Sequence, residues 1–137
     1  MSTWGGHRID HVGIAVHDLD AALLLYGALA RDRPVHRETV PHDGVEVAFL
    51  ELPGASLELL ASRRDDSAVA NFLARRGEGL HHLALAVPDI GAELDRWRGL
   101  GAELIDQVPR AGSRGMLVAF IHPRSAHGVL VELCQRS

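Results

Sequence analysis

Apolar positions along this chain of 137 residues recur with two different periods. Short apolar runs rich in β-branched residues predict strands, whereas apolar residues spaced three or four apart predict helices. The predicted strands cover residues 9–16, 35–40, 45–52, 56–61, 80–87, 103–108, 116–121 and 129–134. The predicted helices run from Asp18 to about Leu29, from just after Asp66, and from Asp89 to Gly99 or Gly101. Asp18 and Asp89 are predicted N-caps, because a carboxylate there accepts backbone N–H groups of the first turn.

The pattern of the first half returns in the second half. The run that begins at His11 reappears at His82, an offset of 82 − 11 = 71 residues, and Ala48-Phe49 returns as Ala119-Phe120 at the same offset. Near the end of each copy, Leu57-Glu58-Leu59 corresponds to Val131-Glu132-Leu133. An internal repeat of this kind fixes the architecture, because each copy is one supersecondary unit that packs against its neighbour.

The repeat predicts an α+β protein made of two tandem βαβββ modules. Module one covers about residues 9–62, a connector covers 63–79, and module two covers about 80–135. Each module alone is too small to be stable, so residues 1–137 are expected to fold as a single domain. The expected product is one curved, barrel-like mixed sheet with the helices outside it.

Composition and charge narrow the class of function. The net charge is −4 with both signs spread along the chain, which does not resemble the basic patch of a nucleic-acid binder. No apolar run is long enough for a membrane span. The start of the chain lacks an apolar signal core and Cys134 is the one cysteine, so we expect a cytoplasmic protein without an internal disulfide.

Two histidines and two glutamates occupy equivalent positions in the repeat. His11 and His82 each lie in the first strand of a module, and each shares its strand face with small residues at alternate positions. Glu58 and Glu132 lie in the last strands, with apolar neighbours turned to the opposite face. The small neighbours leave space, so all four polar side chains could point into one concavity.

Burying a carboxylate in a strand is costly unless it is paired or bound to a cation. Two imidazoles and two carboxylates could surround one divalent ion, and such ligands without thiolate suit Co, Ni, Mn, Fe or Zn better than Ca or Mg. A structural interpretation stays open, because duplicated modules repeat their core residues as well as their functional ones.

The chain resembles the vicinal oxygen chelate superfamily, which includes glyoxalase I, bleomycin-resistance proteins and extradiol dioxygenases. Within it the resemblance is greatest to the methylmalonyl-CoA epimerase family, and it runs from Ile9 to Gln135. It rests on the stretches Ile9–Val16, Ser67–Ala84 and Phe120–Leu133.

The resemblance implies one divalent transition metal, with Co among the candidates, held by His11, Glu58, His82 and Glu132. It also implies an acyl-CoA substrate, inversion of the α-carbon of a 2-methylmalonyl thioester through an enolate, and a homodimer. Inversion needs a base on each face of the substrate, and the pseudo-twofold pair Glu58 and Glu132 would supply them.

Two departures from the family pattern bear on this expectation. Some epimerases carry a catalytic Glu at the position of Val47, whereas Glu46 lies one residue away and should face the opposite side of the strand. A loop that usually reads Gly-Ala-His-Gly is Gly112-Ser113-Arg114-Gly115 here. Arg110, Arg114 and Arg124 are candidate cations for the phosphates of coenzyme A.

Other functions remain compatible with the same residues. An Fe(II) extradiol-type dioxygenase would use His11, His82 and Glu132 as a two-His, one-carboxylate triad. A glyoxalase I-like lyase is a further alternative, and a metal-free small-molecule binding protein could be built on the same scaffold.

Overall fold

The computed structural model describes residues 7–31 and 33–136. The chain divides into two compact units. The first unit is His11–His81, and the second unit combines Met1–Asp10 with His82–Ser137. The division passes through two strands, so the start of the first strand belongs with the second half of the chain.

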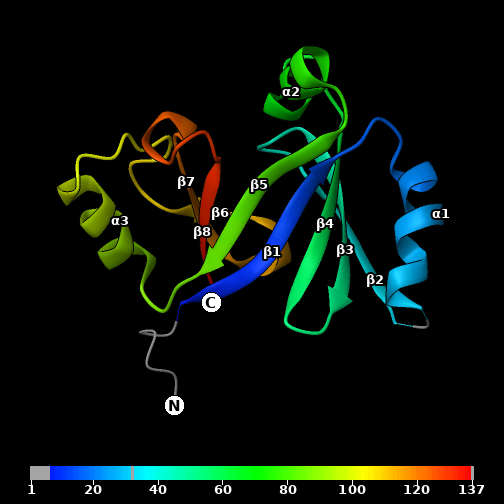
Figure 1. The fold of residues 1–137 in the computed structure, drawn as a ribbon, viewed down its shortest axis with the longest axis horizontal. Coiled ribbons are helices and arrows are strands. Elements are labelled where there is room, and N and C mark those ends of the chain that lie inside the picture. The colour runs from blue at the N-terminus through cyan, green and yellow to red at the C-terminus, as the bar shows by residue number, and fades with distance from the viewer. Residues whose placement is uncertain (1–6, 32, 137) are drawn as a thin grey trace. The chain divides into compact units, whose positions relative to one another are not determined.

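The first unit contains the elements of the predicted first module and connector (Figure 1). They are β1 (Arg8–Ala15, which begins in the second unit), α1 (Leu19–Ala30), β2 (Val35–Val40), β3 (Val45–Leu52), β4 (Ala55–Ser62) and α2 (Ala68–Arg76). Strands β2, β3 and β4 pair antiparallel, and β4 pairs parallel with β1. The helix α1 begins where predicted, because the Asp18 carboxylate accepts the Ala21 N–H at 3.0 Å.

The second unit repeats this order, and its last three strands are shorter than their counterparts in the first unit. Its elements are β5 (Gly79–Ala86, which begins in the first unit), α3 (Ile90–Gly99), β6 (Arg110–Ala111), β7 (Leu117–Ile121), β8 (Val131–Gln135) and two 3₁₀ turns, η1 (Ser113–Gly115) and η2 (Pro123–Ser125). Strands β6, β7 and β8 pair antiparallel, and β8 pairs parallel with β5. The hydrogen-bonded order is β2-β3-β4-β1 in the first unit and β5-β8-β7-β6 in the second. The predicted α+β class and mixed sheet are therefore confirmed.

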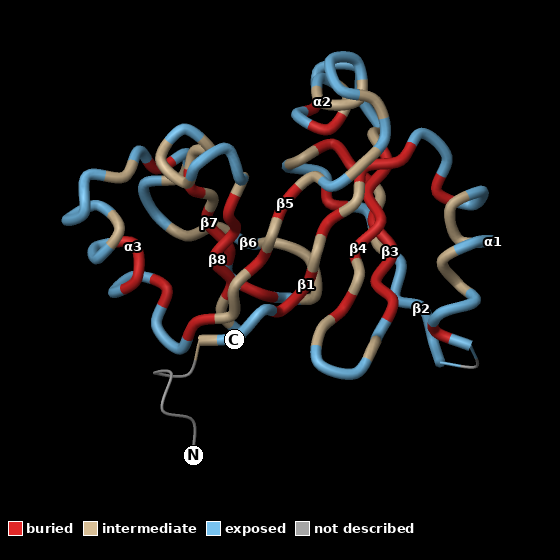
Figure 2. Tube along the Cα trace, viewed as in Figure 1, coloured by how far each residue is buried: buried red, intermediate tan, exposed pale blue. Residues whose placement is uncertain are grey.

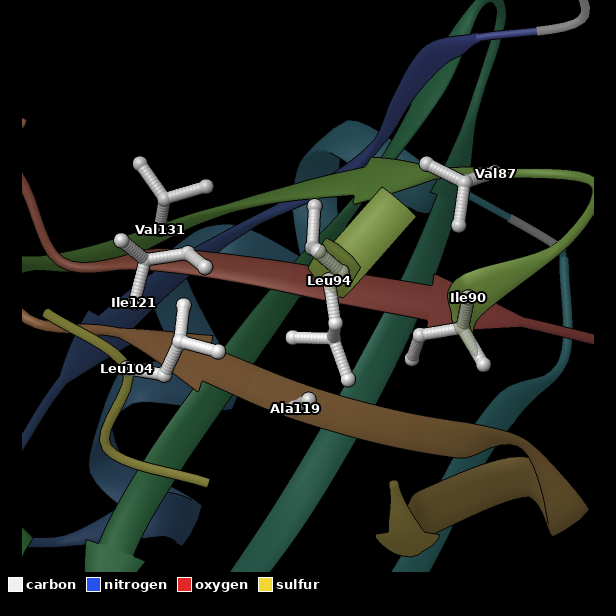
Figure 3. Close-up of a cluster of buried hydrophobic side chains, with 8 residues drawn as sticks. Val87, Ile90, Leu94, Leu104, Ala119, Ile121 and Val131 are labelled. Carbon is white, nitrogen blue, oxygen red and sulfur yellow. The ribbon is translucent and has the colours of Figure 1, made fainter. Parts of the chain in front are cut away.

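Each unit has an apolar core on the helix side of its strands. In the second unit, Leu94 and Ile90 of α3 pack on Ala119, Ile121 and Val131 of the strands (Figure 3). In the first unit, α1 covers the corresponding face of β3 and β4, and the buried strands contrast with the exposed outer side of α1 (Figure 2). The residues between these core positions point to the other face of each unit, which carries the candidate site.

The predicted strand at residues 103–108 is wrong. This segment makes an isolated bridge between Leu104 and Ile121, and the regular strand is β6, which starts after Pro109. The Phe120 carbonyl accepts N–H groups from both Ile105 and Asp106, at 2.9 and 3.3 Å. Two consecutive residues thus share one acceptor, as in a β-bulge, and the regular ladder is interrupted. The Asp106 carboxylate also accepts the Phe120 N–H at 2.9 Å, and this side-chain bond replaces a strand-to-strand bond.

None of the helices in the described part of the chain is long and apolar enough to cross a membrane.

Candidate metal centre and active site

The first unit brings His11 and Glu58 together. His11 lies on β1 and Glu58 on β4, and the parallel register places Glu58 beside Gly13, two residues after the histidine. Nε2 of His11 is 3.2 Å from Oε1 of Glu58, and the two residues are 1% and 5% exposed. Because Gly13 has no side chain, the imidazole and the carboxylate can meet across the strand pair.

The second unit repeats this arrangement with His82 on β5 and Glu132 on β8. The parallel register places Glu132 beside Ala84, again two residues after the histidine. Nε2 of His82 is 3.2 Å from Oε1 of Glu132, and the two residues are 5% and 7% exposed. The sequence repeat is therefore also a repeat of geometry, because each unit holds one His–Glu pair at the same distance.

A phenylalanine ring packs on each of these histidines. This contact was not predicted from the sequence. Phe49 lies opposite Glu58 in the β3–β4 ladder, and its ring meets the His11 ring edge-on with centroids 5.2 Å apart. Phe120 lies opposite Glu132 in the β7–β8 ladder, and its ring meets the His82 ring edge-on at 5.8 Å. The signal was present, because Ala48-Phe49 and Ala119-Phe120 are part of the repeat.

The chemistry of these pairs fits a divalent cation. Each pair places an imidazole nitrogen and a carboxylate oxygen next to each other in a buried setting, and both residue types bind transition metals. A buried carboxylate needs a positive partner, and a bound cation supplies one. Each unit thus carries a buried His/Glu pair that could hold a metal ion.

Cys134 lies on the same face of β8 as Glu132 and is fully buried. Burial, with the charges of Asp10 and Glu132, raises the pKa of its thiol to about 12. Without a bound cation the thiol therefore stays protonated at neutral pH.

Glu46 lies on the face of β3 away from Glu58, as strand alternation predicted. Its carboxylate accepts a hydrogen bond from Arg37 at 2.9 Å and lies 3.6 Å from Arg63. Val47 is 1% exposed and packs with the apolar residues on the Glu58 side. Because Glu46 points to the helix side and is held by arginines, it cannot replace the catalytic Glu that some epimerases carry at the position of Val47.

The three candidate arginines have different surroundings, all within the second unit. Arg124 is exposed and lies 3.2 Å from Glu103. Arg114 forms a partly buried ion pair with Asp10, and its backbone adopts the left-handed conformation with φ of 57°. Arg110 is bound to Asp106 at 3.1 Å and lies over the ring of Phe120.

Comparison with known proteins places this geometry in a family. The family model for the Glyoxalase/Bleomycin resistance protein/Dioxygenase superfamily matches residues 10–120. The chain is 38% identical to an ethylmalonyl-CoA/methylmalonyl-CoA epimerase of Cereibacter sphaeroides, over 93% of this chain and 97% of the relative. It is 33% identical to the mitochondrial methylmalonyl-CoA epimerase of Homo sapiens, over 98% of this chain and 77% of that one.

The chain belongs to the methylmalonyl-CoA epimerase family. A methylmalonyl-CoA epimerase solved in complex with methylmalonyl-CoA and NH4+ superimposes with a TM-score of 0.89 and 41% identity, covering 95% of this chain and 94% of that chain. The predicted resemblance and the predicted epimerase class of enzyme are thereby confirmed for the chain as a whole.

Proposed function

We propose that this enzyme inverts the α-carbon of a 2-methylmalonyl-CoA-like thioester through an enolate. The observation that carries the proposal is the matched pair of buried His–Glu contacts, His11–Glu58 and His82–Glu132, in a chain of the epimerase family. Relatives named for methylmalonyl-CoA, and one solved with it, supply the substrate class.

We assign His11, Glu58, His82 and Glu132 as the ligands of one divalent transition metal. Their nitrogen and oxygen donors suit Co, Ni, Mn or Zn, and Co is our first candidate for the native ion. When bound, such an ion supplies Lewis-acid stabilisation of the negative charge that develops on the thioester oxygen.

Glu58 and Glu132 are the proposed bases. One of the two, as a carboxylate, takes the α-proton from one face of the substrate. The other, which enters the step as a protonated carboxylic acid, gives its proton to the opposite face, and the second epimer reacts with the two roles exchanged. Their equivalent positions in the repeat support the assignment of one of them to each face of the substrate. The buried histidines and the phenylalanine rings against them exclude water, which strengthens the electrostatic stabilisation of the enolate.

The remaining parts of the proposal concern the setting of the enzyme. An acyl-CoA substrate and a single buried free thiol suit the cytoplasm. We also propose a homodimer, in keeping with the family resemblance. All residues of the proposed site come from one chain, so association would stabilise the enzyme without supplying a ligand.

The direct test of the proposed function is epimerisation of a single epimer. The purified protein, loaded in turn with Co, Ni, Mn or Zn, is incubated with one epimer of methylmalonyl-CoA, and the two epimers are separated by chiral chromatography. The proposal predicts approach to a mixture of both epimers, at a rate that depends on the metal. Retention of the starting epimer with every metal would contradict it.

A further inference from the structure

Arg110 lies on the face of the second unit that carries His82 and Glu132. In the β-ladders Arg110 is opposite Val118, Val118 is opposite Cys134, and Phe120 is opposite Glu132. Residues directly opposite in a ladder, and residues two apart along a strand, point to the same face. The arginine side chain therefore belongs to the site face, away from the core under α3.

Aromatic contacts connect the Arg110 guanidinium to the proposed ligand His82. The guanidinium carbon lies 5.6 Å from the centroid of the Phe120 ring, within the range of a cation–π contact. The same ring meets the His82 imidazole edge-on at 5.8 Å. One aromatic ring thus separates a fixed positive charge from a proposed metal ligand.

Asp106 holds this arrangement in place with both of its carboxylate oxygens. Oδ1 accepts a hydrogen bond from Arg110 Nε at 3.1 Å, and Oδ2 accepts the backbone N–H of Phe120 at 2.9 Å. Arg110 and Asp106 are 21% and 16% exposed at their side chains. The guanidinium is therefore oriented and largely shielded from water, which strengthens its attraction for an anion.

The first unit has no arginine at the corresponding place. The neighbour of Phe49 there is His36, at a tilted ring contact of 6.3 Å, and His36 is itself paired with Glu38. The two otherwise equivalent halves therefore differ in charge beside their phenylalanine. A malonyl-type thioester is asymmetric in the same way, because it carries a free carboxylate on one side of its α-carbon only.

We propose that Arg110 is the specificity-determining residue that binds the free carboxylate of the thioester substrate. This inference rests on the proposed function. A planar guanidinium matches a carboxylate bidentately, and Asp106 fixes its plane. The phosphates of coenzyme A are a poorer match, since the whole pantetheine arm separates them from the thioester, whereas Arg110 lies one ring away from His82.

Three ligands distinguish the carboxylate from the phosphates. Methylmalonyl-CoA has both groups, the methylmalonyl thioester of N-acetylcysteamine keeps only the carboxylate, and propionyl-CoA keeps only the phosphates. Binding of each to the metal-loaded protein is measured by calorimetry, for the wild type, for Arg110→Gln and for the control Arg96→Gln. Arg96 is a matched control because it is also an ion-paired arginine of this unit, but it lies exposed on α3 beside Glu93.

Arg110→Gln should weaken binding of the two methylmalonyl thioesters by about 10- to 100-fold, the usual effect of losing a charged hydrogen bond. It should leave propionyl-CoA unchanged, and Arg96→Gln should leave all three ligands unchanged. Weaker binding of only the two CoA thioesters would overturn the proposal in favour of phosphate recognition. Equal weakening of all three ligands would overturn it in favour of a positioning role through Phe120.

A second variant keeps the test valid if Arg110→Gln does not fold, as judged by circular dichroism. Arg110→Lys retains the charge but lacks the planar fork, so it should weaken the same two ligands by a smaller factor and again spare propionyl-CoA. An unchanged affinity of Arg110→Lys for all three ligands would contradict carboxylate recognition by the fork. The calorimetric measurement of binding does not depend on epimerisation. Failure of epimerisation in the wild type would therefore contradict the proposed function, while the binding of the three ligands could still be compared.

Discussion

The two site glutamates are buried in strands, where carboxylates are rare, and each lies 3.2 Å from a buried histidine nitrogen. Burial of a charged group is tolerated only with a compensating partner. Glu46, by contrast, lies near the surface among arginines. These two kinds of surroundings distinguish the two proposed site glutamates from a glutamate of the surface ion-pair network.

The first prediction compares Glu132→Gln with Glu46→Gln. Glutamine keeps the size of glutamate but cannot take a proton, so Glu132→Gln should slow α-proton exchange of methylmalonyl-CoA by about 10²- to 10⁴-fold. Glu46→Gln should change the rate little, because its side chain faces Arg37. The rates are measured by proton NMR. An active Glu132→Gln protein beside an inactive Glu46→Gln protein would show that Glu46 is the base.

The second prediction concerns metal content. His82→Ala removes one of four proposed ligands and should remove most of the bound metal, as measured by elemental analysis of dialysed protein. His42→Ala is the control, because the His42 side chain is 68% exposed in a turn beside Asp43. Full metal content in the His82→Ala protein would place the metal elsewhere.

At the residue scale, alternation along strands predicted the faces on which His11 meets Glu58 and His82 meets Glu132, and it predicted that Glu46 points away. The assignment of the four residues as metal ligands stays a prediction. It could not find the contacts of Arg110, because they depend on the irregular segment that carries Asp106. A side chain that holds both a backbone N–H and a distant guanidinium leaves no periodic signal in the sequence.

At the scale of elements, the helix starts could be predicted because their caps are local. Asp18 and Asp89 each accept an N–H three residues ahead, at 3.0 and 3.1 Å, and Ser67 caps α2 in the same way. The segment 103–108 was mistaken for a strand because its apolar residues, Leu104, Ile105 and Val108, imitate one. Its hydrogen bonds instead depend on Asp106, a tertiary effect that overrides local propensity.

The third prediction uses the repeated caps. Asp18→Ala and Asp89→Ala should each lower the free energy of unfolding by about 1 kcal/mol, since each removes the acceptor for an N–H of the first helical turn. Asp18→Asn and Asp89→Asn are matched controls that keep an acceptor and should lose less. Urea unfolding followed by circular dichroism gives the four values. Equal losses for alanine and asparagine would show that the cap bond is not the cause.

At the scale of the whole molecule, the repeat identified in the sequence predicted the order of elements and the α+β class. The single-domain prediction and the joint use of all four ligands stay predictions. The two epimerase relatives align with more than nine-tenths of this chain.

The fourth prediction is a homodimer at micromolar concentration. Leu24 and Leu25 of α1 are 87% and 71% exposed, and exposed apolar side chains are stabilised when association covers them. Sedimentation velocity should give twice the mass of one chain. A single species with the mass of one chain would contradict the prediction and leave the site unaffected, because every proposed ligand belongs to the same chain.

The measurement that tests the central claim most directly is α-proton exchange by the wild-type protein in deuterated water. The metal-loaded enzyme is mixed with methylmalonyl-CoA, and proton NMR follows the α-proton signal and the methyl doublet. Enolate formation between two carboxylates predicts loss of the α-proton and collapse of the doublet, far faster than in a sample without enzyme. An α-proton that persists as in that blank, with every candidate metal, would contradict the claim that this site epimerises a malonyl-type thioester.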